Sequence, residues 1–272
     1  MKKLMLTAAI LAAGVATADI VSSDVVGYQN KSFESGFNYV ANTFVTVGKS
    51  GSEMTFSSIA KNDSVSYLGT TIQLLDDGGA TATTDAYEDL GTAYLTFTYA
   101  TTDDGAPSNG WYLMDDWGFE HPQNDKVLPF GQGYCVDCGD DGAAFTFAGT
   151  VAKEETEIEL APSFNYTGNC SPKDITFGDL TVNGVVSYLG TTIQLLDDGG
   201  ATATTDEYED LGTAYLTFTY ATTDDGAPSN GWYLMDDWGF EHPQNGRVLA
   251  AGQGFCVDCG DDGATITIPS AL

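Results

Sequence analysis

Pairs of aspartates beside glycine recur along this chain and are the first residues that could do chemistry. They are Asp76, Asp77, Asp103, Asp104, Asp140 and Asp141, and then Asp197, Asp198, Asp224, Asp225, Asp261 and Asp262. Calcium takes about six to eight oxygen ligands, and aspartate carboxylates with loop carbonyls supply them. Asp beside Gly equally forms tight turns, because Gly reaches positive φ and Asp hydrogen-bonds nearby backbone. We expect calcium-binding loops or plain turns here; none has the spacing of an EF-hand loop.

A second candidate site is the aromatic and acidic stretch at residues 110–122, which is repeated at residues 231–243. Its candidate ligand-binding residues are Trp117, Phe119, Glu120 and His121, together with Trp238, Phe240, Glu241 and His242. Flat rings stack on sugars and carboxylates accept hydrogen bonds from hydroxyl groups, so the stretch is typical of a carbohydrate-binding face. Trp and Phe also fill the cores of β domains, which is the competing interpretation.

Catalysis is the weaker interpretation of the same residues. Glu120 or Asp115 could pair with another acid as in glycoside hydrolysis, but a chain with 39 acidic residues brings acids together by chance. His121 is the only histidine of its half, which excludes a histidine-rich zinc site there, and no Gly-x-Ser-x-Gly elbow is present. We predict a protein that is not an enzyme, with an extracellular glycoside hydrolase as the remote alternative.

The five cysteines form the third set, with Cys135 and Cys138 in one Cys-Val-Asp-Cys motif, Cys256 and Cys259 in its repeat, and Cys170 left over. In an exported protein such residues are disulfide candidates before they are metal ligands. Strand alternation would place Cys138 on the face of Tyr134 and Val136, and Cys135 on the other face. The two cysteines of a motif can therefore pair only where the strand bends. Bridges to another strand, domain or subunit stay open, as does a redox or zinc role.

These residues are positioned by a long internal repeat. Residues 65–124 recur as residues 186–245, with Ala86 against Glu207 as the single difference, and the Cys motifs keep the same offset of 121 (256 − 135). A period above about 100 residues indicates two whole domains rather than a solenoid. We expect domains at 19–150 and 151–272. The copies diverge at Leu128-Pro129-Phe130 against Leu249-Ala250-Ala251, which predicts a tailored interface between two equal surfaces.

The elements of each copy should be short strands. Leu95, Phe97 and Tyr99 alternate with polar or smaller residues, and similar runs occur at residues 65–68, 72–75, 111–114, 134–138, 145–147 and 156–160. Turn-forming Asp, Gly, Asn and Pro separate these runs. The pattern predicts an all-β fold of two antiparallel β-sandwiches, or small barrels.

The first 18 residues read as a secretory signal, with Lys2 and Lys3, an apolar run to Val15, and Ala16-Thr17-Ala18 as the cleavage site. Its removal takes the formal net charge from −30 to −32 (−30 − 2). Such acidity argues against nucleic acid and anionic membranes as partners, and no apolar run is long enough to span a bilayer. We expect a secreted bacterial protein, extracellular or at the cell surface.

Three stretches carry a resemblance: residues 24–31 (Asp-Val-Val-Gly-Tyr-Gln-Asn-Lys), residues 36–42 (Gly-Phe-Asn-Tyr-Val-Ala-Asn) and residues 130–137 (Phe-Gly-Gln-Gly-Tyr-Cys-Val-Asp). They resemble uncharacterised secreted, β-rich repeat proteins of Verrucomicrobia-like bacteria. The resemblance implies export and a β fold, and it implies no activity.

Two functions therefore compete. The first is a non-enzymatic structural or surface protein that assembles with itself, with calcium as its stabilising cation. The second is an adhesive module that binds extracellular glycans twice, gaining avidity from linked sites. Solvent-facing Trp117 and Trp238 would favour glycan binding, whereas bare strand edges at the two ends would favour assembly.

Overall fold

The computed structural model describes residues 26–47, 53–61, 70–75, 94–113, 121–140, 142–183, 192–196, 215–234, 242–261 and 263–270. Within these ranges the chain is all-β, and its helical turns are the short 3₁₀ segments η1 Phe56–Ser58, η3 Thr102–Asp104, η4 Phe177–Asp179 and η7 Thr223–Asp225. None of the described helices is long and apolar enough to cross a membrane.

The strands of the first half are β1 Val26–Phe33, β2 Phe37–Ala41, β3 Thr46–Val47, β4 Ala60–Lys61, β5 Thr71–Leu75, β6 Tyr94–Ala100, β7 Gly110–Leu113, β8 Gly133–Asp137 and β9 Ala143–Thr150. Those of the second half are β10 Thr156–Leu160, β11 Phe164–Gly168, β12 Ile175–Thr176, β13 Thr181–Asn183, β14 Thr192–Leu196, β15 Tyr215–Ala221, β16 Gly231–Leu234, β17 Val248–Leu249, β18 Gly254–Asp258 and β19 Ala264–Ile268.

Each half pairs a large sheet with a smaller one. The large sheets have the orders β2-β8-β5-β6-β7 and β11-β18-β14-β15-β16, and the smaller sheets are built around β9 and β19. All the pairs among the described strands are antiparallel. None of these sheets, as far as the described strands show, closes on itself, so the layers are sandwich-like rather than small barrels. The antiparallel all-β prediction is confirmed.

Strand alternation explains where the cores lie. Ile72 and Phe97 are opposite each other and nearly inaccessible to solvent, as are their counterparts Ile193 and Phe218. One hydrophobic cluster draws its buried members from Phe33 to Val151, and a second draws them from Leu160 to Ile268. Each half therefore builds a core of its own.

Most of the predicted strands are present. The runs at residues 72–75, 111–114, 134–138, 145–147 and 156–160 coincide with β5, β7, β8, β9 and β10 to within a few residues at their ends. The alternation around Leu95 and Phe97 is β6. The run predicted at residues 65–68 lies outside the described residues.

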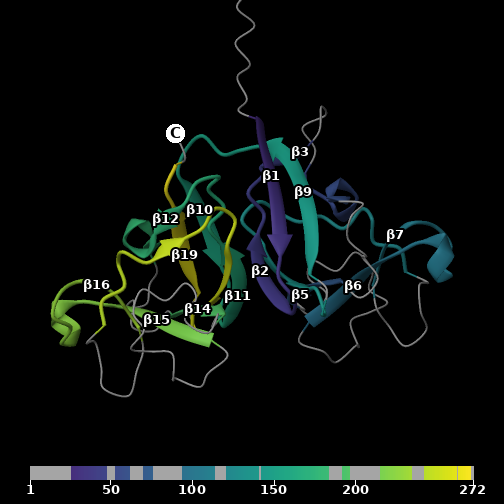
Figure 1. Cartoon of the computed structure of the whole chain (residues 1–272). Helices are drawn as coiled ribbons and strands as arrows, with labels where there is room; N and C mark the ends of the chain where they lie inside the picture. Colours follow the sequence, from purple (N-terminus) through teal and green to yellow (C-terminus); the bar gives the residue numbers. More distant parts are fainter. Residues whose placement is uncertain are drawn as a thin grey trace, which may run out of the picture.

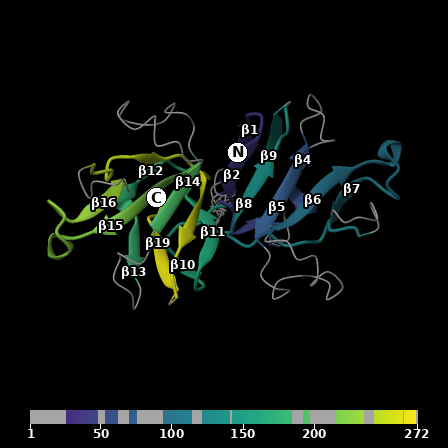
Figure 2. The same ribbon diagram turned by 90° about the horizontal axis from the view of Figure 1, so that it is seen from below.

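The two halves lie side by side with their large sheets running away from a shared middle. Figure 1 shows β2 and β11 near the centre, with β7 and β16 at opposite ends of the molecule, and Figure 2 shows the same order from below. The register also repeats, since Thr98 faces Tyr112 as Thr219 faces Tyr233. The last described strand of each repeated block, β7 or β16, therefore lies at the end of the molecule away from the junction.

Candidate functional site at the junction of the two halves

The outer faces of the two large sheets meet through a pair of tyrosines. Tyr39 on β2 and Tyr166 on β11 have ring centroids 5.1 Å apart. Their hydroxyl oxygens lie 3.2 Å apart and share a hydrogen bond. Because the two residues occupy equivalent positions in the halves (166 − 39 = 127 and 164 − 37 = 127 for the preceding phenylalanines), the contact is self-complementary.

Glycine lets the two backbones approach beside this pair. A Cβ on Gly133 would lie 2.5 Å from the carbonyl oxygen of Thr167. A Cβ on Gly254 would lie 2.5 Å from the backbone nitrogen of Val40. Gly254 follows Gly133 by 121 positions and Thr167 follows Val40 by 127 (254 − 133, 167 − 40). The junction is thus reciprocal, with each half giving the other the same contact.

Each half also contacts the other through a turn, at residues 129–133 in the first half and at residues 250–252 in the second. The side chains at these two turns differ. Phe130 of the first half packs against the core of the second half, alongside the half-buried Ile158. Gly131 then lies against Ile158, and its carbonyl oxygen accepts a hydrogen bond of 2.8 Å from Thr167 Oγ1. The predicted tailoring of Leu128-Pro129-Phe130 is confirmed for Phe130, whose counterpart in the repeat is Ala251.

The opposite turn is held by polar side chains. Lys31 Nζ donates a hydrogen bond of 2.6 Å to the carbonyl oxygen of Gly252, and Gln29 Nε2 donates one of 3.2 Å to that of Ala251. Burial lowers the pKa of Lys31 to about 8, and the negative charge of Asp174 opposes that effect. The contacts around Phe130 are therefore mainly apolar, and those of Lys31 and Gln29 are polar. The two ends of the junction are chemically distinct.

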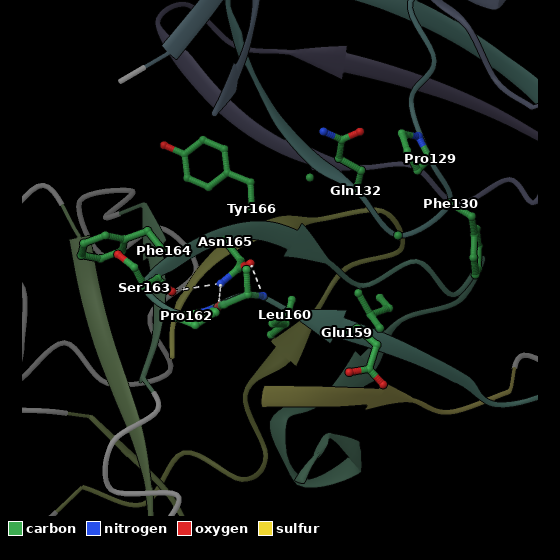
Figure 3. A pocket seen from close by; sticks show the side chains of 14 residues that line it. Pro129, Phe130, Gln132, Glu159, Leu160, Pro162, Ser163, Phe164, Asn165 and Tyr166 are labelled. Carbon is green, nitrogen blue, oxygen red and sulfur yellow. Dashed lines mark hydrogen bonds between the residues drawn. The ribbon is translucent and has the colours of Figure 1, made fainter. Parts of the chain in front are cut away.

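The apolar side of the junction opens into a groove of about 690 Å³, which we call the junction groove. It lies between the turn at residues 129–133 and the segment at residues 158–166. Figure 3 shows Phe130 and Phe164 at opposite ends of the view, with Leu160 and Glu159 between them. Phe164 is 52% exposed although its ring is apolar. A concave, mainly apolar surface with a single charged side chain suits an extended ligand better than a small ion.

Asn165 shapes one wall of the groove by holding the turn before β11. Its Nδ2 donates to the carbonyl oxygens of Ala161 (2.8 Å) and Ser163 (2.9 Å), while its Oδ1 accepts from the Ala161 N–H (2.9 Å). These bonds occupy the amide, so Asn165 is a structural residue of the groove. Ser163 adopts a left-handed backbone with φ of 71° where the first half has Gly36 with φ of 80°.

All five cysteines are buried and none is bridged to another. Cys138 shares the core face with Tyr134 and Val136, whereas Cys135 is opposite Tyr39 on the face toward the junction. The predicted separation of the two side chains is confirmed. Burial raises the pKa of Cys135, Cys170 and Cys256 to about 12, and that of Cys138 and Cys259 to about 11. Thiols with such pKa values stay protonated at neutral pH and are poor nucleophiles.

Two of the predicted calcium ligands are caps of short turns. Asp104 Oδ2 accepts from the Thr101 N–H (2.9 Å) and Oγ1 (2.7 Å), and Asp225 does the same with Thr222 (3.0 and 2.7 Å). Asp103, Asp224, Asp140 and Asp261 are exposed, and Asp76, Asp77, Asp141, Asp197, Asp198 and Asp262 lie outside the described residues. Over the part of the chain that is described, no group of three or more His, Cys, Asp or Glu side chains could hold a metal ion.

The aromatic stretch is described only at its borders. Trp117, Phe119, Glu120, Trp238, Phe240 and Glu241 lie outside the described residues, so the glycan-binding face stays a prediction. His121 and His242 are half-buried. Their carbonyl oxygens accept hydrogen bonds from Leu113 (3.1 Å) and Leu234 (3.2 Å). Trp111 and Trp232 belong to the two cores.

The residues that sequence reasoning missed are those whose environment exists only at the junction. Lys31 reads as an exposed lysine of an edge strand, and Gly133 reads as a turn residue. The divergence between the copies was a usable signal, because Pro129-Phe130 and Ala250-Ala251 differ although residues 65–124 and 186–245 are almost identical. No protein-family model, curated protein or solved structure matches the chain, so no family is assigned by similarity.

Proposed function

We propose that the chain is a secreted, non-enzymatic structural or cell-surface protein. It consists of two copies of an acidic β domain, at residues 19–150 and 151–272, after a signal peptide at residues 1–18. The observation that carries the proposal is the reciprocal junction, in which the Tyr39–Tyr166 pair and two close backbone approaches hold the copies in one arrangement. Such a junction repeats a surface at fixed spacing, which serves display or assembly better than it serves a reaction.

The polar groups described in each copy support the same conclusion. Asp104 and Asn165 bond to nearby backbone, and the Asn124 Oδ1 accepts from the Trp111 N–H at 2.9 Å. These side chains stabilise turns and strand ends. Among the other described acids, Asp103, Asp140, Asp224 and Asp261 lie exposed in turns. A formal net charge of −30 favours solubility and the binding of divalent cations.

Self-assembly by extending the large sheets at their far ends is not favoured. The outer edge of β7 is covered, because the Leu113 N–H donates to His121 O and the Gln123 N–H donates to Trp111 O. The outer edge of β16 is covered in the same way by His242 and Gln244. We therefore assign assembly to cation-bridged acidic loops rather than to the ends of the large sheets.

Export and assembly are tested on the full chain. We expect a bacterial host to release a protein whose first residue is Asp19, and we expect this protein to enlarge in calcium and return to a monomer in chelator when followed by light scattering. Retention of the uncleaved chain in the cytoplasm would contradict secretion. A size and melting temperature that ignore both calcium and chelator would contradict the cation-bridged assembly.

A further inference from the structure

Beside the junction groove runs a strand with a free edge. β10 is the terminal strand of its sheet and pairs only with β19 among the described strands. No backbone hydrogen bond reaches its other edge from any described residue. Unpaired N–H and C=O groups on a strand edge are a template for another strand, and β10 contributes Ile158, Glu159 and Leu160 to the wall of the groove.

The two faces of β10 differ in charge. Glu157 and Glu159 are exposed on one face, whereas Ile158 and Leu160 point to the apolar side. A strand added to this edge would share these two faces, because directly opposed residues of neighbouring strands lie on the same side. The edge therefore suits a segment with basic residues on one face and apolar residues on the other.

A second copy of the chain does not meet that requirement. An antiparallel β10–β10 pair centred on Ile158 would set Glu157 of each copy opposite Glu159 of the other, and like charges in directly opposed positions are destabilising. The counterpart strand β1 carries Asn30 and Ser32 in place of these acids, as its pairing with β9 shows (Phe33 with Ala143, against Leu160 with Ala264). The acidic edge is a property of the second half alone.

We propose that the free edge of β10 and the junction groove bind an extended segment of another protein that alternates basic and apolar residues, by adding it as a strand. Its basic side chains pair with Glu157 and Glu159. Its apolar side chains lie toward Ile158 and the exposed ring of Phe164. Main-chain hydrogen bonds to β10 supply the affinity, as in other cases of strand addition, and the acidic chain attracts the basic segment.

The test uses the mature full chain and a blocked, labelled peptide of sequence Lys-Val-Lys-Val-Lys-Val-Lys, at physiological salt. We expect saturable binding by fluorescence anisotropy, together with slower hydrogen exchange of the β10 amides but not of the β1 amides. A peptide with proline at the central valine should bind at least about tenfold more weakly, since it lacks a ladder donor. Equal binding of the two peptides would overturn strand addition.

Two matched double variants separate this site from general attraction to an acidic protein. Glu157→Lys with Glu159→Lys should weaken binding about tenfold or more, whereas Glu154→Lys with Glu155→Lys, the same charge change just before the strand, should change it less than about twofold at physiological salt. Circular dichroism of both variants checks that they fold. Equal losses in the two variants, or absence of binding by the unmodified protein, would overturn the proposal.

Discussion

The backbone at Ser163 is strained, whereas at its counterpart Gly36 the same conformation is free of cost. Both have a left-handed φ, of 71° and 80° respectively, and a side chain in that region costs about 1–2 kcal/mol. We expect Ser163→Gly to raise the free energy of unfolding by about 0.5–1 kcal/mol after the entropy of glycine is subtracted. Gly36→Ser should lower it by a similar amount. Urea unfolding measures both changes in the free energy of unfolding. A Ser163→Gly variant that is less stable, or a Gly36→Ser variant that is more stable, would contradict strain at this position.

Buried thiols make stability depend on pH in the alkaline range. Burial raises the pKa of Cys135 and Cys256 from 9.0 to about 12, so the folded chain keeps protons that the unfolded chain releases. Their contribution is complete below pH 9 and is lost as the pH rises toward 12. We expect the free energy of unfolding to fall over that range.

The double variant Cys135→Ala with Cys256→Ala isolates this effect. Lys31 acts in the opposite direction, because burial lowers its pKa in the folded chain from 10.5 to about 8. The unfolded chain therefore holds this proton to higher pH, and the effect of Lys31 is to raise the free energy of unfolding between about pH 8 and pH 10.5. The quantity to measure is therefore the difference between the unmodified chain and the double variant at each pH. That difference should shrink above pH 9; a constant difference would exclude thiol linkage.

At the scale of elements, adjacent aspartates have different tasks. Both side chains are exposed, but Asp104 accepts two hydrogen bonds from Thr101 at the start of η3, and Asp103 does not take part in this cap. Asp104 is the third residue of η3 and closes a capping box with Thr101. Losing its hydrogen bonds costs about 0.5–1.5 kcal/mol, while a surface change that removes no such bond costs less than about 0.5 kcal/mol. We expect Asp104→Ala to lower the thermal midpoint in the absence of calcium and Asp103→Ala to leave it unchanged. Equal effects of the two substitutions would argue against the cap.

The strands could be predicted because their cause is local. Alternation predicted the strand around Leu95 and Phe97, and it set Cys135 and Cys138 on opposite faces, as the structure has them. The junction depends on contacts between residues more than 100 positions apart, such as Lys31 with Gly252. The residues next to Lys31 and Gly252 in the sequence give no indication of this contact. The groove at residues 158–166 could not be foreseen either, since its second wall belongs to the other half.

For the whole molecule, the junction decides whether the two cores melt together. The cores are separate clusters, and they are joined by the Tyr39–Tyr166 pair, by the bridge between Val40 and Gln253, and by Phe130. Among the described residues, Phe130 is the side chain of the first half that packs against the core of the second. If the free energy of these contacts exceeds the difference in free energy of unfolding between the halves, the protein unfolds in one transition.

Phe130→Ala tests that coupling. Truncation of a fully buried Phe costs about 3–5 kcal/mol, so this half-buried ring should contribute about 1–3 kcal/mol. Calorimetry should show one transition for the unmodified chain and two for Phe130→Ala, with the second half melting first because its core loses the ring. Phe37→Ala is the matched control, since that ring is 58% exposed and its loss should cost less than about 0.5 kcal/mol. A single, unshifted transition in Phe130→Ala would mean that the remaining contacts alone couple the halves.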